Sequence, residues 1–182
     1  VLGVAVFPLL GVGGMQLFKA EVPGPTTDKL VPRVGETAKL LWKVYVFLSI
    51  VLFVFLSVGG MNNFEAICHT MSTMATGGFS TRAASVGGFG SAYTEWVLAI
   101  FMLIAGTNFT LHFAALNGRF KPYGRDVEFR AYVSIILFAT MFVVISLLSS
   151  GTYSNILTAL RDGLFQVASI MTGTGFASTD YE

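Results

Sequence analysis

Two short segments of the chain combine small residues, glycine and phenylalanine in the same order. The first reads S-T-M-A-T-G-G-F-S over residues 72–80, and the second reads S-I-M-T-G-T-G-F-A over residues 169–177, 97 positions later. Each follows a short apolar run, which in a membrane is the form of a re-entrant pore loop. Its extended backbone carries carbonyls that can replace the water around an ion. The two segments therefore predict an ion pathway.

Glycine stands at equivalent places, Gly78 and Gly175, because a carbonyl-lined strand needs backbone angles that other residues resist. The predicted filter segments are 76–80 (first filter segment) and 173–177 (second filter segment), with the following aromatic packed behind each. The predicted ion-binding backbone carbonyls are those of Thr76, Gly77, Gly78, Phe79, Gly173, Thr174, Gly175 and Phe176. Thr-Gly in the first segment corresponds in sequence to Gly-Thr in the second. We therefore expect a less regular ring of oxygens, and weaker selectivity for potassium, than in a pore made of four identical segments.

Composition places the chain in a membrane. Hydrophobic residues make up 54% of its 182 residues and charged residues 12%, against about 25% charged in soluble domains. The net charge of +1 indicates no nucleic-acid partner, and the single cysteine indicates neither a disulfide nor a transition-metal site. We find no nucleophile–base pair, nucleotide loop or metal cluster, so an enzyme is disfavoured.

The hydrophobic pattern predicts an all-α integral membrane protein with repeated helix–pore loop–helix units. The expected order is the end of a truncated transmembrane helix at 1–18, a cytoplasmic loop at 19–37, a complete repeat at 38–116, a cytoplasmic loop at 117–128 and a partial repeat at 129–182. In the complete repeat, spans at 38–58 and 92–116 flank a pore helix at 64–75. The partial repeat has a transmembrane helix at 129–148 and a pore helix at 154–171. Pore helices of this length are too short to cross a bilayer.

Basic residues set the expected orientation. Segments 19–43 and 119–130 hold nine of the eleven lysines and arginines, whereas 59–96 and 149–182 hold one each. By the positive-inside bias the first two segments are cytoplasmic, so both pore loops enter from outside.

Other polar residues have a functional and a structural interpretation. Asn108 either holds neighbouring helices or lines the pathway, and Arg82 either tethers the filter loop or tunes the local cation concentration through its charge. For His69, a buried hydrogen-bonded role is favoured over proton coupling. Glu65 and Asp162 are expected at pore-helix N-termini, where the helix dipole favours anions.

Five motifs carry a family resemblance: A-T-G-G-F-S-T at 75–81, A-G-T-N-F-T-L-H-F at 105–113, R-D-V-E-F-R at 125–130, F-Q-V-A-S-I-M-T-G-T-G-F at 165–176 and A-E-V-P-G-P at 20–25. Through them nearly the whole chain resembles the TrkH-type potassium uptake proteins of the Trk/Ktr/HKT cation transporter superfamily, as an internal fragment. The resemblance implies four repeats with pseudo-fourfold symmetry around one pore in the bacterial inner membrane. It also implies K⁺ as the transported ion, no cofactor, a homodimer and a cytoplasmic nucleotide-binding regulatory ring.

Two other interpretations stay open. An alternating-access cation symporter is also built from repeats and broken helices, although many such carriers use inverted repeats. A non-transporting membrane scaffold has no need of paired Gly-Phe segments.

Overall fold

The computed structural model describes residues 34–151, 153 and 155–179, so the predicted truncated helix 1–18 and most of the loop 19–37 lie outside the described residues. No β-strand occurs among those residues. The helices are α3 (Val34–Val58), α4 (Asn63–Met74), η2 (Ser85–Phe89, a 3-10 helix), α5 (Ala92–Ala105), α6 (Phe109–Leu116), α7 (Lys121–Arg125), α8 (Val127–Ser149) and α9 (Ile156–Met171).

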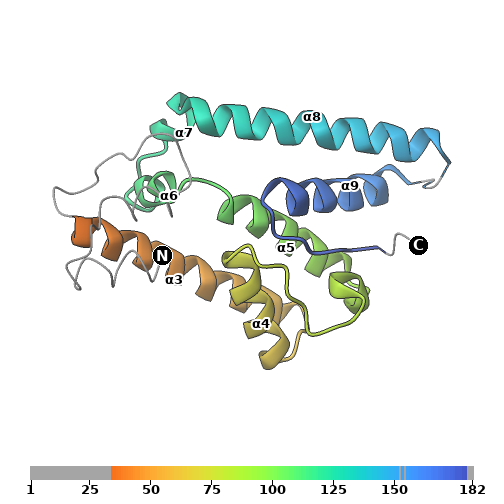
Figure 1. Cartoon of the computed structure of the whole chain (residues 1–182), viewed down its shortest axis with the longest axis horizontal. Coiled ribbons are helices and arrows are strands. Elements are labelled where there is room, and N and C mark those ends of the chain that lie inside the picture. The colour runs from red at the N-terminus through yellow and green to blue at the C-terminus, as the bar shows by residue number, and fades with distance from the viewer. Residues whose placement is uncertain (1–33, 152, 154, 180–182) are drawn as a thin grey trace. The chain divides into compact units, whose positions relative to one another are not determined.

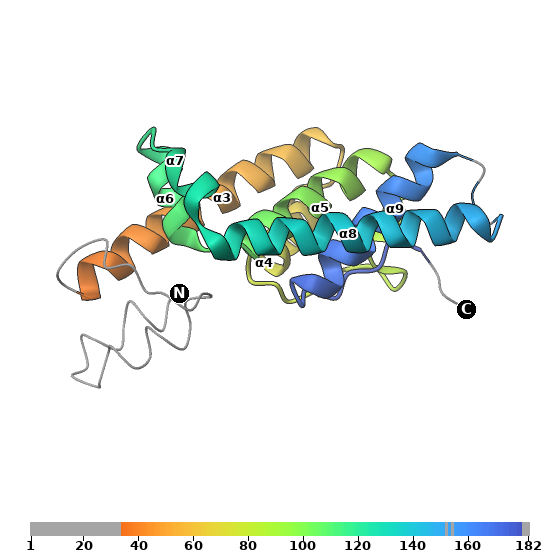
Figure 2. The same ribbon diagram turned by 90° about the horizontal axis from the view of Figure 1, so that it is seen from above.

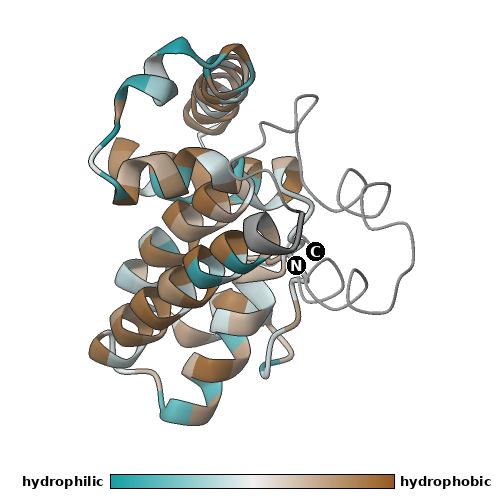
Figure 3. Ribbon diagram, turned by 90° about the vertical axis from the view of Figure 1, so that its left-hand side faces the viewer, coloured by the Kyte–Doolittle hydropathy of each residue, from teal (hydrophilic) through white to brown (hydrophobic). Residues whose placement is uncertain are grey.

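Two helices of the described chain are long and apolar enough to cross a membrane, Ala38–Val58 within α3 and Val127–Ser149, and α5 with α6 counts as a third if the pair is one broken span. Brown, apolar residues run along the helices in Figure 3. α8 leaves side chains such as Leu137, Phe138 and Phe142 exposed and buries one stripe, Ile136, Thr140 and Val144. An apolar outer surface of this kind suits lipid or further protein in a membrane.

The predicted span 92–116 is not one helix. α5 ends at Ala105, and α6 begins at Phe109 after a three-residue break. The break has a local cause, because Asn108 is the N-cap of α6 and its side chain accepts a hydrogen bond from Thr110 N. The continuous helix expected over 92–116 is therefore wrong, although the apolar segment itself is present.

The chain divides into two compact units. The described part of the first unit consists of residues 34–48 and 107–130. Pairs of aromatic rings contact each other within it. The ring centroids of Tyr45 and Phe109 lie 6.4 Å apart, and those of Tyr123 and Phe129 lie 4.8 Å apart. The Tyr123 hydroxyl lies 2.7 Å from His112 Nδ1, and burial raises the pKa of that tyrosine.

The described part of the second unit consists of residues 49–106 and 131–179, and it contains both predicted pore helices and both filter segments. α5 lies between α4 and α9 and packs against both (Figure 1). α8 runs beside α9, as Figures 1 and 2 agree, and a Cβ on Gly163 of α9 would lie 3.2 Å from the Val144 side chain. The arrangement brings the two half-length helices to one core helix.

Candidate functional site

Each filter segment begins directly after the C-cap of a half-length helix. The C-cap is Ala75 for α4 and Thr172 for α9. Backbone hydrogen bonds fold the segment back onto the helix: Gly77 N donates to Ser72 O at 2.7 Å, and Gly175 N donates to Ser169 O at 3.3 Å. The C-terminal end of a helix carries about half a negative charge. Both helices therefore place a cation-favouring end beside a filter segment.

The two filter segments share one backbone pattern. Thr76 and Gly78 have φ of +52° and +67°, and Gly173 and Gly175 have φ of +70° and +86°. These are equivalent pairs, 97 positions apart, with a left-handed residue at every second position. Such alternation turns successive peptide planes, so that carbonyls can face one side instead of alternating as they do in a β-strand. Thr76 was predicted as a filter residue, but its left-handed conformation was not; its alignment with Gly173 was the available signal.

Gly78 is also a point of close approach between the segments. A Cβ built on it would collide with the carbonyl oxygen of Thr174 and lie 3.1 Å from the carbonyl carbon of Gly175. A Cβ on Gly175 would meet nothing within 4 Å among the described atoms. Glycine is therefore favoured at Gly175 because of its positive φ alone, and at Gly78 because of its positive φ and because a side chain would collide with the second filter segment.

The two filter aromatics differ. Phe176 is 2% exposed and stacks on the His69 ring of α4, with centroids 5.8 Å apart and an interplanar angle of 20°. Phe79 is 80% exposed. The expected packing of both aromatics is therefore seen for Phe176, which lies against α4, and is not seen for Phe79 among the described residues.

His69 connects the pore helix to the end of the first filter segment. Its Nδ1 lies 2.8 Å from Glu65 O and its Nε2 lies 3.0 Å from Ser80 Oγ, and the residue is fully buried. A carbonyl only accepts, so Nδ1 carries a proton and donates to Glu65 O, while Nε2 pairs with the Ser80 hydroxyl. Ser80 Oγ in turn accepts from Arg82 N at 3.2 Å. Both ring nitrogens of His69 therefore have partners, which favours a structural role.

Arg82 holds the loop that follows the first filter segment. Its Nε lies 3.0 Å from Glu65 Oε1, its Nη1 donates to Gly88 O at 2.8 Å, and its guanidinium carbon lies 4.0 Å from the centre of the Phe89 ring. Glu65 is in the first turn of α4, as predicted, and also contacts the N-cap Asn62. These contacts favour tethering over a purely electrostatic role.

The loop after the first filter segment also binds the second. Gly87 N donates to Ala177 O at 3.1 Å, and Ala177 N donates to Ser85 Oγ at 3.2 Å. A Cβ on Gly87 would lie 2.5 Å from Ser178 O. The end of the second filter segment therefore runs along η2.

Asp162 does not cap its helix. α9 begins at Ile156 with Asn155 as the N-cap, so Asp162 lies in the second turn and the expectation for it is wrong. Its Oδ1 accepts from Arg161 Nε at 2.9 Å, and the same Nε lies 2.6 Å from Glu95 Oε2 on α5. Both carboxylates are buried, so this pairing with Arg161 compensates their desolvation.

Asn108 lies in the first unit, whereas the filter segments lie in the second. Its Oδ1 accepts from Thr110 N at 3.0 Å and from Thr110 Oγ1 at 2.9 Å. These contacts are local and explain why the residue is a helix cap. The described contacts therefore favour the structural interpretation of Asn108.

The fold and the two filter segments define a class of protein. It is an all-helical membrane protein in which two half-length helices lead into segments with the same left-handed backbone pattern. A family model described as TrkH, cation transport protein, matches residues 1–182. The chain belongs to this TrkH family.

Relatives agree over nearly the whole chain. The Trk system potassium uptake protein TrkH of Salmonella typhimurium is 47% identical over 180 residues, and that of Escherichia coli K12 is 45% identical; both alignments cover 98% of this chain and 37% of the relative. The crystal structure of the potassium transporter TrkH from Vibrio parahaemolyticus superposes with a TM-score of 0.78 at 39% identity, over 98% of this chain and 36% of that one. The chain thus spans little more than a third of its relatives' length.

Proposed function

We propose that the two filter segments are two walls of one potassium-conducting pore in a TrkH-type uptake protein. The observation that carries the proposal is the shared pair of left-handed residues, Thr76 with Gly78 and Gly173 with Gly175, each after the C-terminal end of a half-length helix. That geometry suits backbone carbonyls that replace the hydration shell of K⁺.

Relatives named as potassium uptake proteins support potassium as the ion. The longer relatives leave room for the two remaining walls, so we assign 38–116 to a complete repeat and 129–182 to part of the next. A membrane transporter of this kind needs no catalytic group, and K⁺ is its cargo rather than a cofactor. Placement in the bacterial inner membrane, a homodimer and a cytoplasmic regulatory ring belong to the same proposal, supported by relatives that are named as parts of a Trk system.

The test is flux of K⁺ or Rb⁺ into liposomes that contain the full-length protein, with Gly78→Ser and Gly175→Ser compared. A side chain at a left-handed position costs about 1–2 kcal/mol, which corresponds to about a tenfold change. We expect both variants to lower flux or the preference for K⁺ over Na⁺ by at least that factor. Gly78→Ser should be the more severe, because its side chain also meets Thr174 O.

Gly90→Ser is the matched control. Gly90 has φ of +59° and open space around its Cβ position, so it carries the same conformational cost, but it lies after η2 and outside both filter segments. Its flux and ion preference should stay near those of the unmodified protein. Unchanged flux and ion preference in both filter variants would overturn the filter assignment.

A further inference from the structure

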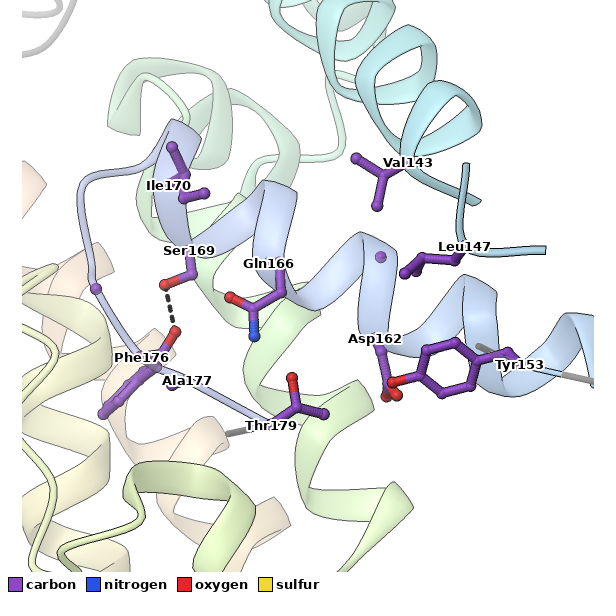
Figure 4. A pocket seen from close by; sticks show the side chains of 12 residues that line it. Val143, Leu147, Tyr153, Asp162, Gln166, Ser169, Ile170, Phe176, Ala177 and Thr179 are labelled. Carbon is purple, nitrogen blue, oxygen red and sulfur yellow. Dashed lines mark hydrogen bonds between the residues drawn. The ribbon is translucent and has the colours of Figure 1, made fainter. Parts of the chain in front are cut away.

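The carbonyl oxygen of Phe176, one of the predicted ion-binding atoms, accepts a hydrogen bond inside the protein. Ser169 of α9 donates it from its hydroxyl at 2.7 Å, the dashed line in Figure 4. This is the usual length of a good O–H···O hydrogen bond, and both residues are buried, Ser169 at 1% and Phe176 at 2% exposed. Because a carbonyl only accepts and a hydroxyl has one proton, the Ser169 proton is committed to Phe176 O.

The corresponding serine of the first repeat, Ser72 of α4, makes no such contact. Ser72 is also buried, but its Oγ has no hydrogen-bond partner among the described residues. In the same part of the chain no donor reaches the carbonyl oxygen of Phe79, which corresponds to Phe176. The same two residue types, placed at the same spacing, are therefore bonded in the second filter segment and not in the first.

The backbone explains the difference. In the first filter segment Gly77 N donates to Ser72 O at 2.7 Å. In the second, the hydrogen bond to Ser169 O comes from Gly175 N, one residue later than the position that corresponds to Gly77. The second filter segment is thus attached to its helix one residue further along the chain, which brings Phe176 O within reach of the Ser169 hydroxyl.

A second pair of hydroxyls holds the same segment to α9. Thr172 Oγ1 donates to Ala168 O at 2.8 Å, so it accepts from the Thr174 hydroxyl, which lies 2.7 Å away. The corresponding residues of the first repeat are Ala75 and Gly77, which have no hydroxyl. Side chains therefore fix the start and the end of the second filter segment in a way that the first does not share.

We propose that Ser169 is a positioning residue of the filter, whose hydroxyl holds the Phe176 carbonyl against α9 and away from the ion. The proposal rests on the proposed filter function. Gly173 and Gly175 are exposed, and no described hydrogen bond occupies their carbonyls, so these oxygens are free for K⁺. The two walls then differ in their ligands, because the first offers the Phe79 carbonyl and the second does not offer that of Phe176.

Flux of K⁺ and Na⁺ into liposomes that contain the full-length protein tests this role. Ser169→Ala releases the Phe176 carbonyl, and a mobile oxygen can follow the smaller Na⁺ as well as K⁺. We expect the preference for K⁺ over Na⁺ to fall at least about fivefold, which corresponds to the 1 kcal/mol typical of one hydrogen bond.

Ser72→Ala is the matched control. It deletes the same hydroxyl at the corresponding position, where that hydroxyl has no described partner, and it keeps the backbone carbonyl that Gly77 N contacts. Its ion preference should stay near that of the unmodified protein. Equal falls in Ser169→Ala and Ser72→Ala would overturn the positioning role, and so would a lower Tm of Ser169→Ala with unchanged ion preference.

Ser169→Thr separates the hydroxyl from the rest of the side chain. Threonine keeps the donor, and its extra methyl has room because Ser169 lines a cavity of about 450 Å³ (Figure 4). We expect this variant to keep an ion preference near that of the unmodified protein. A fall as large as that of Ser169→Ala, with an unchanged Tm, would contradict the role of the hydroxyl.

Solid-state NMR of the full-length protein tests the carbonyl itself and does not depend on how the Ser169 variants fold. With ¹³C on phenylalanine carbonyls and ¹⁵N on alanine, the Phe176 signal is the one that is absent in Ala177→Gly. Replacing K⁺ by Na⁺ should leave this signal in place, whereas the Gly175 carbonyl, selected through its bond to Phe176, should shift. A shift of the Phe176 signal as large as that of Gly175 would overturn the proposal.

Failure of this role can be told apart from failure of the filter. If Ser169→Ala leaves ion preference unchanged while Gly78→Ser and Gly175→Ser lower flux or preference, the positioning role is wrong and the filter function stands. If the two glycine variants also have no effect, the filter assignment fails with it.

Discussion

At the scale of single residues, Arg82 can act in two ways beside the predicted filter, as a tether or through its charge. A tether acts through geometry: one guanidinium reaches Glu65, Gly88 O and the face of Phe89 together. An electrostatic role would act through the positive charge of Arg82 alone, and salt would weaken it. Because the Arg82 side chain is 42% exposed, its ion pair contributes only about 0.2–1 kcal/mol, and the contact with Phe89 adds about 0.5–1 kcal/mol.

Arg82→Lys distinguishes the two roles. Lysine keeps the charge but lacks the planar fork that makes several contacts at once. We expect Arg82→Lys to destabilise the full-length protein by about 1 kcal/mol and to change ion preference as much as Arg82→Gln does, at low and high ionic strength alike. Thermal unfolding and liposome flux at two salt concentrations measure this. The electrostatic role would be favoured instead if Arg82→Lys matched the unmodified protein in stability and ion preference and if the change in ion preference of Arg82→Gln disappeared at high salt.

The sequence indicates which residues form the two predicted filter segments, but it does not indicate every backbone angle and contact that the structure shows there. Gly78 and Gly175 could be predicted because glycine is the residue expected where φ is positive. The positive φ of Thr76 could not be predicted in this way, because threonine rarely takes φ of +52° and only its alignment with Gly173 indicates it. Phe79 and Phe176 look alike in sequence, but Phe176 stacks on the His69 ring whereas Phe79 is exposed, a difference that tertiary contacts make and sequence does not show.

At the scale of elements, α5 organises the second unit. It packs against both α4 and α9, and at its end the Tyr132 side chain of α8 and Thr172, the C-cap of α9, both lie close to it. Gly106, its C-cap, marks this point: a Cβ there would lie 2.7 Å from Tyr132 Oη and 2.8 Å from Thr172 Cγ2. A residue without a side chain lets the three elements meet.

Gly106→Ala should therefore destabilise the protein by about 1–3 kcal/mol through overpacking. The φ of Gly106 is −76°, so the alanine backbone itself is unstrained. Adding Tyr132→Phe, which removes the crowded oxygen, should recover part of the loss. Thermal unfolding measures both, with Gly124→Ala as control because a Cβ on Gly124 meets nothing within 4 Å. Equal Tm values for Gly106→Ala and Gly124→Ala would contradict this account of the contact.

The positions of the spans and of the half-length helices follow from hydrophobic length, which is why 38–58 and 129–148 could be placed without a structure. The break between α5 and α6 could not be placed that way, because apolar residues continue on both sides of it. Its cause is one polar side chain, Asn108, that bonds to the backbone two residues ahead. The A-G-T-N sequence at 105–108 holds the signal, since glycine weakens a helix and asparagine caps one.

At the scale of the whole molecule, charge gives the orientation that packing does not. Segment 119–130 carries four basic residues, whereas 59–96, which contains the first filter segment, carries only Arg82. The positive-inside bias predicts that 119–130 is cytoplasmic and that the first filter segment lies at the outer side. The segments are joined by the apolar residues 92–116, so the orientation also requires that α5 and α6 together cross the membrane.

Cysteine labelling tests that orientation in the full-length protein with Cys68 replaced by serine. Ala83, exposed after the first filter segment, and Gly124, exposed in α7, are suitable positions because neither replacement removes a basic residue. We expect a membrane-impermeant maleimide to label Ala83→Cys in intact spheroplasts and to label Gly124→Cys only after the membrane is opened. The reverse pattern would invert the topology and put the pore loops on the inner side. Labelling of both in intact spheroplasts would mean that 92–116 does not cross, which would remove the physical basis for treating 38–116 as a complete repeat.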